Sequence, residues 1–150
     1  MNNIKVGYFT EGGWEGKIQK DSNYWDKNMR TDAAWICTLG ATHHPILKLN
    51  TLPDKFYDIG IVVIPKVLDN YVNYPIVKEL KRVCKKIGFM QEGPSWYFQS
   101  LDIRKQMWFY NIMESVDFVW CHNDIDKEYY EGLLGKPTYI NPTLDRKSVV

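Results

Sequence analysis

Apolar residues follow two alternating patterns along the chain, short unbroken runs and stripes spaced by three or four residues. The clearest run lies in residues 58–65, DIGIVVIP, and predicts a strand that is buried on both faces, as in the middle of a parallel sheet. Shorter runs predict further strands at 5–10, 43–49, 88–91, 118–120 and 138–140. The stripes between these runs predict helices.

Three stripes define apolar helical faces, formed by Trp25, Met29, Ala33 and Ile36, by Ile76, Leu80, Val83 and Ile87, and by Phe109, Ile112, Met113 and Val116. The chain therefore alternates strand and helix with short connections. This alternation predicts an α/β fold, a Rossmann-like three-layer domain with a mainly parallel sheet.

Residues 116–144 contain the most complete set of local signals. Asn123 or Asp124 is placed to cap a helix after the strand at 118–120, Gly135 provides a left-handed stop, and Pro137 prevents continuation. Asp102 is placed to cap the preceding helix in the same way. These signals predict strand, helix and strand in sequence.

The composition excludes several classes of protein. Of the 150 residues, 45% are hydrophobic and the net charge is +1, so we expect a soluble domain with no nucleic-acid partner. No apolar run approaches membrane-spanning length, and we expect no signal peptide at the N-terminus. The three cysteines lack CxxC spacing, which predicts reduced thiols and a cytoplasmic protein.

Polar, glycine and aromatic residues follow the predicted strands. In an open parallel sheet, ligands bind beyond the carboxyl ends of the strands, so these residues are candidates for a site. They are Gly12, Gly13 and Trp14 after the first strand, Lys66 after the third, Gln91, Glu92 and Trp96 after the fourth, and His122 and Asn123 after the fifth. Each has a plainer alternative as a turn residue, a solvated charge or a cap.

The order of motifs in residues 116–144 also resembles a known family. Strand, polar loop, helix, Gly135-Lys136-Pro137, strand and Asn141-Pro142-Thr143 are similar to the end of the N-terminal domain of GT-B-type glycosyltransferases. The resemblance implies that residues 1–144 form an acceptor-side domain and that residues 145–150 begin the linker to a donor-binding domain. The implied reaction transfers a sugar from a nucleotide-sugar donor to an acceptor hydroxyl, without a cofactor.

Two residues are candidates for the base that this reaction needs. Glu92 is the first, because it leaves a strand at the ligand-binding edge, and His122 is the second, because histidine exchanges protons near neutral pH. The other candidates, Gly12, Gly13, Trp14, Lys66, Gln91, Trp96 and Asn123, are expected to bind the acceptor.

Two other functions fit parts of the sequence. Asp124 and Asp126 form an Asp-x-Asp that could hold a cation, as in GT-A-type glycosyltransferases, but both open a helix, where capping explains them, so we expect no metal. His43 and His44 are adjacent and should point to opposite faces of a strand. A non-catalytic Rossmann-like or flavodoxin-like binding or assembly domain also has this α/β pattern.

Overall fold

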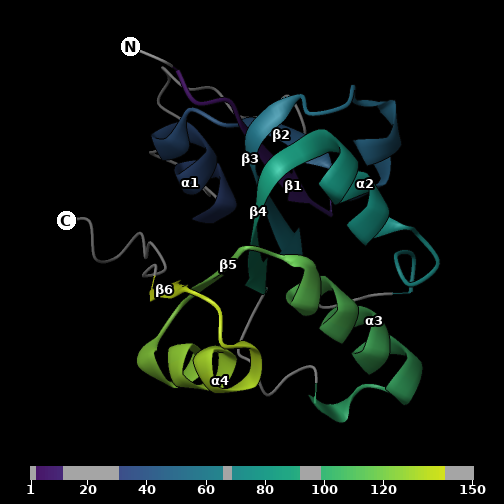
Figure 1. Cartoon of the computed structure of the whole chain (residues 1–150), viewed down its shortest axis with the longest axis vertical. Helices are drawn as coiled ribbons and strands as arrows, with labels where there is room; N and C mark the ends of the chain where they lie inside the picture. The colour runs from purple at the N-terminus through teal and green to yellow at the C-terminus, as the bar shows by residue number, and fades with distance from the viewer. Residues whose placement is uncertain (1–2, 12–30, 66–68, 92–98, 141–150) are drawn as a thin grey trace.

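The computed structural model describes residues 3–11, 31–65, 69–91 and 99–140. Within them, strands and helices alternate as the sequence predicts (Figure 1). The elements in chain order are β1 (Val6–Thr10), α1 (Thr31–Leu39), β2 (Thr42–Pro45), the 3-10 helix η2 (Ile46–Thr51), β3 (Tyr57–Ile64), α2 (Ile76–Val83), β4 (Cys84–Gln91), α3 (Ile103–Ser115), β5 (Phe118–Cys121), α4 (Asp124–Leu134) and β6 (Thr138–Ile140).

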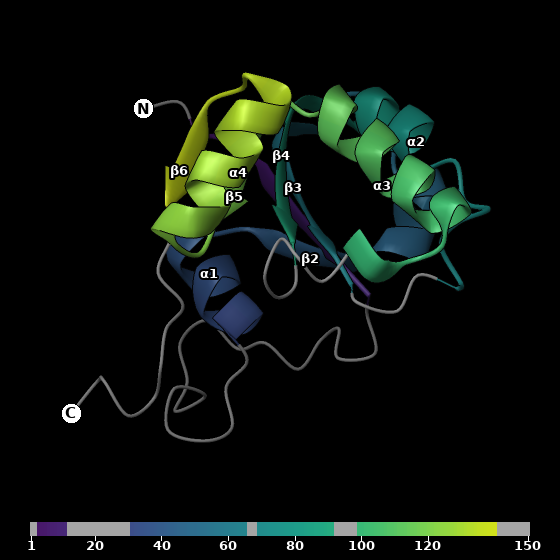
Figure 2. The ribbon, with the colours of Figure 1, turned by 90° about the horizontal axis from the view of Figure 1, so that it is seen from below.

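The six strands form one sheet in the order β2-β1-β3-β4-β5-β6, and every pair of neighbouring strands is parallel. Helices α2, α3 and α4 cover one face of the sheet, and α1 covers the other (Figure 2). The prediction of a Rossmann-like three-layer α/β fold is therefore confirmed.

Strand β3 shows why this sequence forms a three-layer structure. Val62 and Ile64 pack among the helices on the α2–α4 side, while Ile61 and Val63 pack with α1 on the other side. A strand with apolar residues at consecutive positions must be covered on both faces, since its side chains alternate between them.

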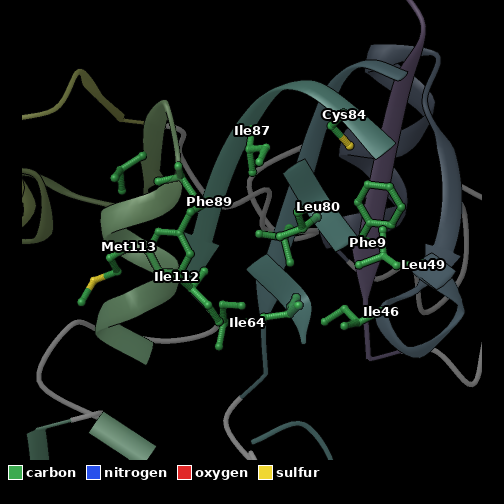
Figure 3. Close-up of a cluster of buried hydrophobic side chains, with 14 of the residues drawn as sticks. Phe9, Ile46, Leu49, Ile64, Leu80, Cys84, Ile87, Phe89, Ile112 and Met113 are labelled. Carbon is green, nitrogen blue, oxygen red and sulfur yellow. The ribbon is translucent and has the colours of Figure 1, made fainter. Parts of the chain in front are cut away.

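The larger of the two apolar clusters lies between the sheet and the helices α2, α3 and η2. Figure 3 shows Leu80 between Phe89, which lies beside Ile112, and Phe9, which lies beside Leu49, so that side chains from strands and helices are interleaved. All five are at most 1% exposed, so the helices are held to the sheet by complete removal of these side chains from water.

Two predicted element boundaries are wrong. The sequence predicts a strand through residues 43–49, but β2 ends at Pro45 and a 3-10 helix follows. Ile46 and Leu49 are three residues apart, and both point into the large cluster, as the period of a 3-10 helix requires. Arg82 stabilises this turn by donating hydrogen bonds to the carbonyl oxygens of Leu49 (3.1 Å) and Leu52 (2.7 Å).

The second boundary concerns residues 84–87. Ile87 continues the apolar stripe of α2, which predicts a helix, but the helix ends at Val83 and β4 begins at Cys84. Parallel pairing with β3, from Tyr57 opposite Cys84 onward, takes these residues into the sheet. Ile87 is buried in β4, and an apolar residue can also be buried on a helix face. Its hydrophobicity therefore does not distinguish a strand from a helix.

None of the helices in the described part of the chain is both long and apolar enough to cross a membrane.

Candidate functional site

The carboxyl ends of all six strands lie along the same edge of the sheet, because every pairing is parallel. Strands β4 and β5 are neighbours, and they end at Gln91 and Cys121. Adjacent strands lie about 4.8 Å apart. The residues that follow these two strand ends are therefore brought together from distant parts of the sequence.

His122 lies directly after β5 and contacts the end of β4. Its Nε2 atom is 3.2 Å from the backbone carbonyl oxygen of Gln91. A carbonyl oxygen only accepts hydrogen bonds, so Nε2 must carry the proton in this contact. In the neutral imidazole, Nδ1 then carries the lone pair. The fold thus selects the tautomer in which Nδ1 is the basic atom of His122.

Gln91 is 3% exposed, and its side chain points into the protein. Its Oε1 atom accepts a hydrogen bond from the hydroxyl of Tyr130, which lies on α4. Burial and the nearby Asp126 carboxylate raise the pKa of Tyr130, so the phenol keeps the proton that it donates. The Gln91 side chain is therefore hydrogen-bonded inside the protein, and it links the end of β4 to α4.

The sequence analysis did not single out Tyr130, although this residue joins the end of β4 to α4. The available signal was its spacing of four residues from Asp126, which places both on one face of the helix. Tyr130 and Asp126 are the buried residues of α4. Its ring also packs edge-on against Phe89, with the ring centroids 5.8 Å apart.

Asn123 acts as the N-cap of α4, as the sequence predicts. Its side-chain oxygen accepts a hydrogen bond from the backbone N–H of Asp126 at 2.8 Å, and its Nδ2 atom is 3.3 Å from the Asp126 carboxylate. Asp124 and Asp126 lie in the first turn, where negative charge suits the helix dipole. Across the described ranges, no three His, Cys, Asp or Glu side chains are grouped so that they could hold a metal ion.

The Gly135-Lys136 pair has a structural role at the other end of α4. Gly135 adopts the left-handed conformation with φ 63°, which confirms the predicted stop. The Lys136 ammonium then donates to the carbonyl oxygens of Met113 (3.1 Å), Val116 (2.7 Å) and Glu114, at the end of α3. One lysine thereby satisfies three carbonyl groups that a helix terminus leaves without intrahelical partners.

A second polar contact lies at the carboxyl ends of β1 and β2. The Thr10 hydroxyl is buried and lies 2.7 Å from Nε2 of His43. On the opposite face, the ring of His44 stacks on Phe9, with centroids 5.7 Å apart. The prediction that the two histidines point to opposite faces is confirmed. The hydroxyl of Tyr71 also reaches the Glu11 carbonyl oxygen, at 3.2 Å.

The structure brings together Gln91, His122 and Asn123 among the predicted site residues. The remaining ones lie outside the described residues, namely Gly12, Gly13, Trp14, Lys66, Glu92 and Trp96. Glu92 follows Gln91 directly in the chain, so it is one peptide bond from the contact with His122. The end of β1 is three strands away from the end of β5, which corresponds to about 14 Å.

Comparison of the chain with protein-family models, with curated proteins and with solved structures gives no match.

Proposed function

We propose that this chain is the acceptor-side domain of a GT-B-type glycosyltransferase, with His122 as a base for the acceptor hydroxyl. The observation that supports this most directly is the contact between His122 Nε2 and the Gln91 carbonyl oxygen. It leaves the lone pair on Nδ1, in a residue that follows a strand at the edge where open parallel sheets bind ligands.

In the proposed reaction, Nδ1 of His122 removes the proton from the acceptor hydroxyl. The resulting oxygen attacks the anomeric carbon of the donor sugar, and the bond from that carbon to the nucleotide diphosphate breaks. A positioned base of this kind contributes about 10²–10⁴-fold to the rate. Glu92, next to Gln91 in the chain, is the alternative base. The nucleotide-sugar donor would be bound mainly by a donor-binding domain or a partner subunit.

The test is turnover by the protein that the complete reading frame encodes, measured as nucleotide release from a panel of nucleotide-sugars and acceptors. We expect His122→Asn to lower kcat by about 10²-fold or more, since asparagine keeps a polar side chain but accepts no proton. Glu92→Gln tests the alternative base in the same assay. Glu131→Gln, on the exposed surface of α4, serves as a control.

If turnover is unchanged in both His122→Asn and Glu92→Gln, neither residue is the base and the proposed mechanism is wrong. If no combination of nucleotide-sugar and acceptor supports turnover by the complete protein, glycosyl transfer itself is refuted.

A non-catalytic flavodoxin-like binding domain is the second candidate, and the strand order favours it. The order β2-β1-β3-β4-β5 is that of flavodoxin-like sheets, in which the ligand binds where β1 and β3 diverge. The two functions therefore predict ligands at different strand ends. In NMR spectra, an acceptor sugar should shift the backbone amide resonances of Gln91 and His122. The ligand of a flavodoxin-like binding domain should instead shift the amide resonances of Thr10, Glu11 and Ile64.

A further inference from the structure

The side chain of Tyr130 connects helix α4 to the end of β4. Helix α4 packs against β5 and β6 (Figure 2), and Tyr130 reaches past them to β4. There its ring meets Phe89 edge-on, and its hydroxyl donates a hydrogen bond to Oε1 of Gln91. Tyr130 is 2% exposed and Gln91 is 3% exposed. The phenol and the amide are therefore paired inside the protein, away from water.

The surroundings of this pair are apolar. Phe89, Val119 and Cys121 belong to the same buried cluster as Tyr130. Two apolar side chains of similar shape could replace a buried hydrogen-bonded pair at little or no cost in stability. A satisfied buried hydrogen bond instead fixes one arrangement of the groups that it joins. Stability alone therefore does not account for the pair, and what the pair fixes is the end of β4.

The direction of this hydrogen bond is constant over a wide range of pH. Burial and the nearby Asp126 carboxylate raise the pKa of Tyr130, so the phenol keeps its proton wherever a histidine can act as a base. The side chain of Gln91 does not titrate. Its Oε1 atom therefore has a steady donor in Tyr130.

The backbone of Gln91 is the group that His122 contacts. Strand β4 pairs with β5 at Gly88 and Phe89, so Gln91 lies two residues beyond this pairing. Its carbonyl oxygen is 3.2 Å from Nε2 of His122. The direction of that carbonyl depends on the backbone torsions of Gln91. A side chain held in one position restricts these torsions, because the allowed rotamers of a residue depend on its φ and ψ.

His122 is tied to the same helix from its other side. Asn123, the next residue, caps α4 by accepting a hydrogen bond from the backbone N–H of Asp126 at 2.8 Å. Asn123 and Tyr130 are seven residues apart, which places them on one face of the helix and about 10 Å apart along it. One path of contacts runs from His122 through Asn123 into α4. The other runs from Tyr130 on α4 through Gln91 back to the imidazole, so a single helix sets both sides of the contact.

We propose that Tyr130 is a positioning residue for His122. By holding the side chain of Gln91, Tyr130 directs the Gln91 carbonyl oxygen at Nε2 and keeps the imidazole turned so that Nδ1 is available to the acceptor hydroxyl. This role rests on the proposed function of His122 as the base. Tyr130 is buried and acts through geometry alone. Displacing a catalytic group by about 1 Å can lower the rate about 10²-fold.

The first experiment measures turnover by the protein that the complete reading frame encodes. Tyr130→Phe removes the hydroxyl and keeps the ring. We expect kcat to fall about tenfold, because the imidazole is less well oriented, and KM for the acceptor to stay unchanged. Tyr129→Phe is the matched control, since it removes the same group from the adjacent, half-buried position of α4 and should leave kcat unchanged. Circular dichroism establishes that both variants keep the fold.

A double-mutant cycle with His122 separates positioning from a general effect on the fold. In the His122→Asn background, Tyr130→Phe should not lower kcat further, because the group that it positions is gone. A purely structural role would lower kcat by the same factor in both backgrounds. Gln91→Met removes the acceptor and keeps the length of the side chain. It should lower kcat as Tyr130→Phe does, and the two together should lower it no further.

The second experiment needs no turnover. With ¹⁵N-labelled histidine, the Nε2–H of His122 should be visible as a slowly exchanging proton at a pH of about 8, where an ordinary histidine side chain is neutral. The loss of this signal in His122→Asn identifies it. We expect its exchange with water to be about tenfold faster in Tyr130→Phe, because the hydrogen bond to Gln91 is weakened, and unchanged in Tyr129→Phe.

Unchanged exchange in Tyr130→Phe overturns the inference and leaves the proposed function standing, since His122→Asn tests the base separately. Equal losses of kcat in the parent and His122→Asn backgrounds also overturn it. Faster exchange with unchanged kcat shows that the orientation of His122 does not limit turnover, which refutes the catalytic role of the contact. If the complete protein has no turnover at all, the proposed function fails, and the exchange rate alone decides whether Tyr130 holds His122.

Discussion

Gly60 lies at the centre of the sheet, where a single added methyl group meets a closed core. A Cβ atom at this position would be 2.3 Å from Sγ of Cys84 and 3.1 Å from Cε2 of Phe9. Favourable contacts between nonbonded heavy atoms begin at about 3.5 Å. Cys84 is 1% exposed and Phe9 is completely buried, so neither side chain can turn into solvent.

We expect Gly60→Ala to lower the free energy of unfolding by about 3 kcal/mol, the upper end of the range for an overpacked core. The reason is that relief of the overlap requires a movement of more than 1 Å, by the distances above, between the two central strands β3 and β4. Gly88→Ala is the comparison. Its Cβ would meet the end of the Phe118 ring, which is half-buried and can turn away, so we expect a loss of about 1 kcal/mol.

A second substitution tests the assigned cause. Cys84→Ala removes Sγ and should by itself cost about 1 kcal/mol through lost burial. If the overlap with Sγ causes the loss in Gly60→Ala, the double variant should lose about 2 kcal/mol, because only the milder contacts with Phe9 Cε2 (3.1 Å) and with the Cβ of residue 84 (3.2 Å) remain. Independent effects would instead add to about 4 kcal/mol.

The assay is urea unfolding followed by circular dichroism, with each variant compared at constant m-value. A loss of 3 kcal/mol corresponds to a midpoint shift of about 1–2 M urea for a chain of this size. Gly60→Ala with the midpoint of the parent chain would refute the reasoning, as would strict additivity in the double variant. The first result would mean that β3 and β4 move apart at little cost, and the second would mean that the overlap with Sγ of Cys84 does not cause the loss.

Two further predictions concern a cap and a half-buried histidine. Asn123→Ala should lower stability by about 1 kcal/mol, measured by urea unfolding, because α4 loses its N-cap, and an effect no larger than that of Asp124→Asn would contradict this role. Burial lowers the pKa of His44 below its ordinary 6.5, so the unfolded chain takes up a proton there before the folded chain does, and stability should fall as the pH drops below about 6.5 until the folded group also titrates. His44→Phe should flatten this part of the curve of stability against pH between 7.5 and 5, and the same slope in both proteins would show that other groups cause it.

Local chemistry in the sequence determined where several elements begin and end. Asn123 and Asp102 cap their helices through their own side-chain oxygens, each bonded to a backbone N–H three residues later. Gly135 ends α4 because glycine adopts positive φ without a steric penalty. These interactions span a few residues, so the sequence pattern alone predicts them.

The alternation of apolar runs and stripes also predicted the α/β class, since short unbroken runs favour buried strands and stripes spaced by three or four residues favour helices. The pattern failed at residues 46–49 and 84–87, where the same apolar residues are buried in more than one local structure. There the choice depended on distant partners, namely Arg82 for the 3-10 turn and β3 for the start of β4.

The candidate site depended on tertiary structure in a stronger sense. His122 and Gln91 are 31 residues apart in the chain, and Tyr130 and Gln91 are 39 apart. The tautomer of His122 and the burial of the Gln91 side chain follow from the pairing of β4 with β5 and the position of α4 over them. Sequence spacing carries no information about which strand ends become neighbours, because strand order is decided by how whole helices and strands bury their apolar faces together.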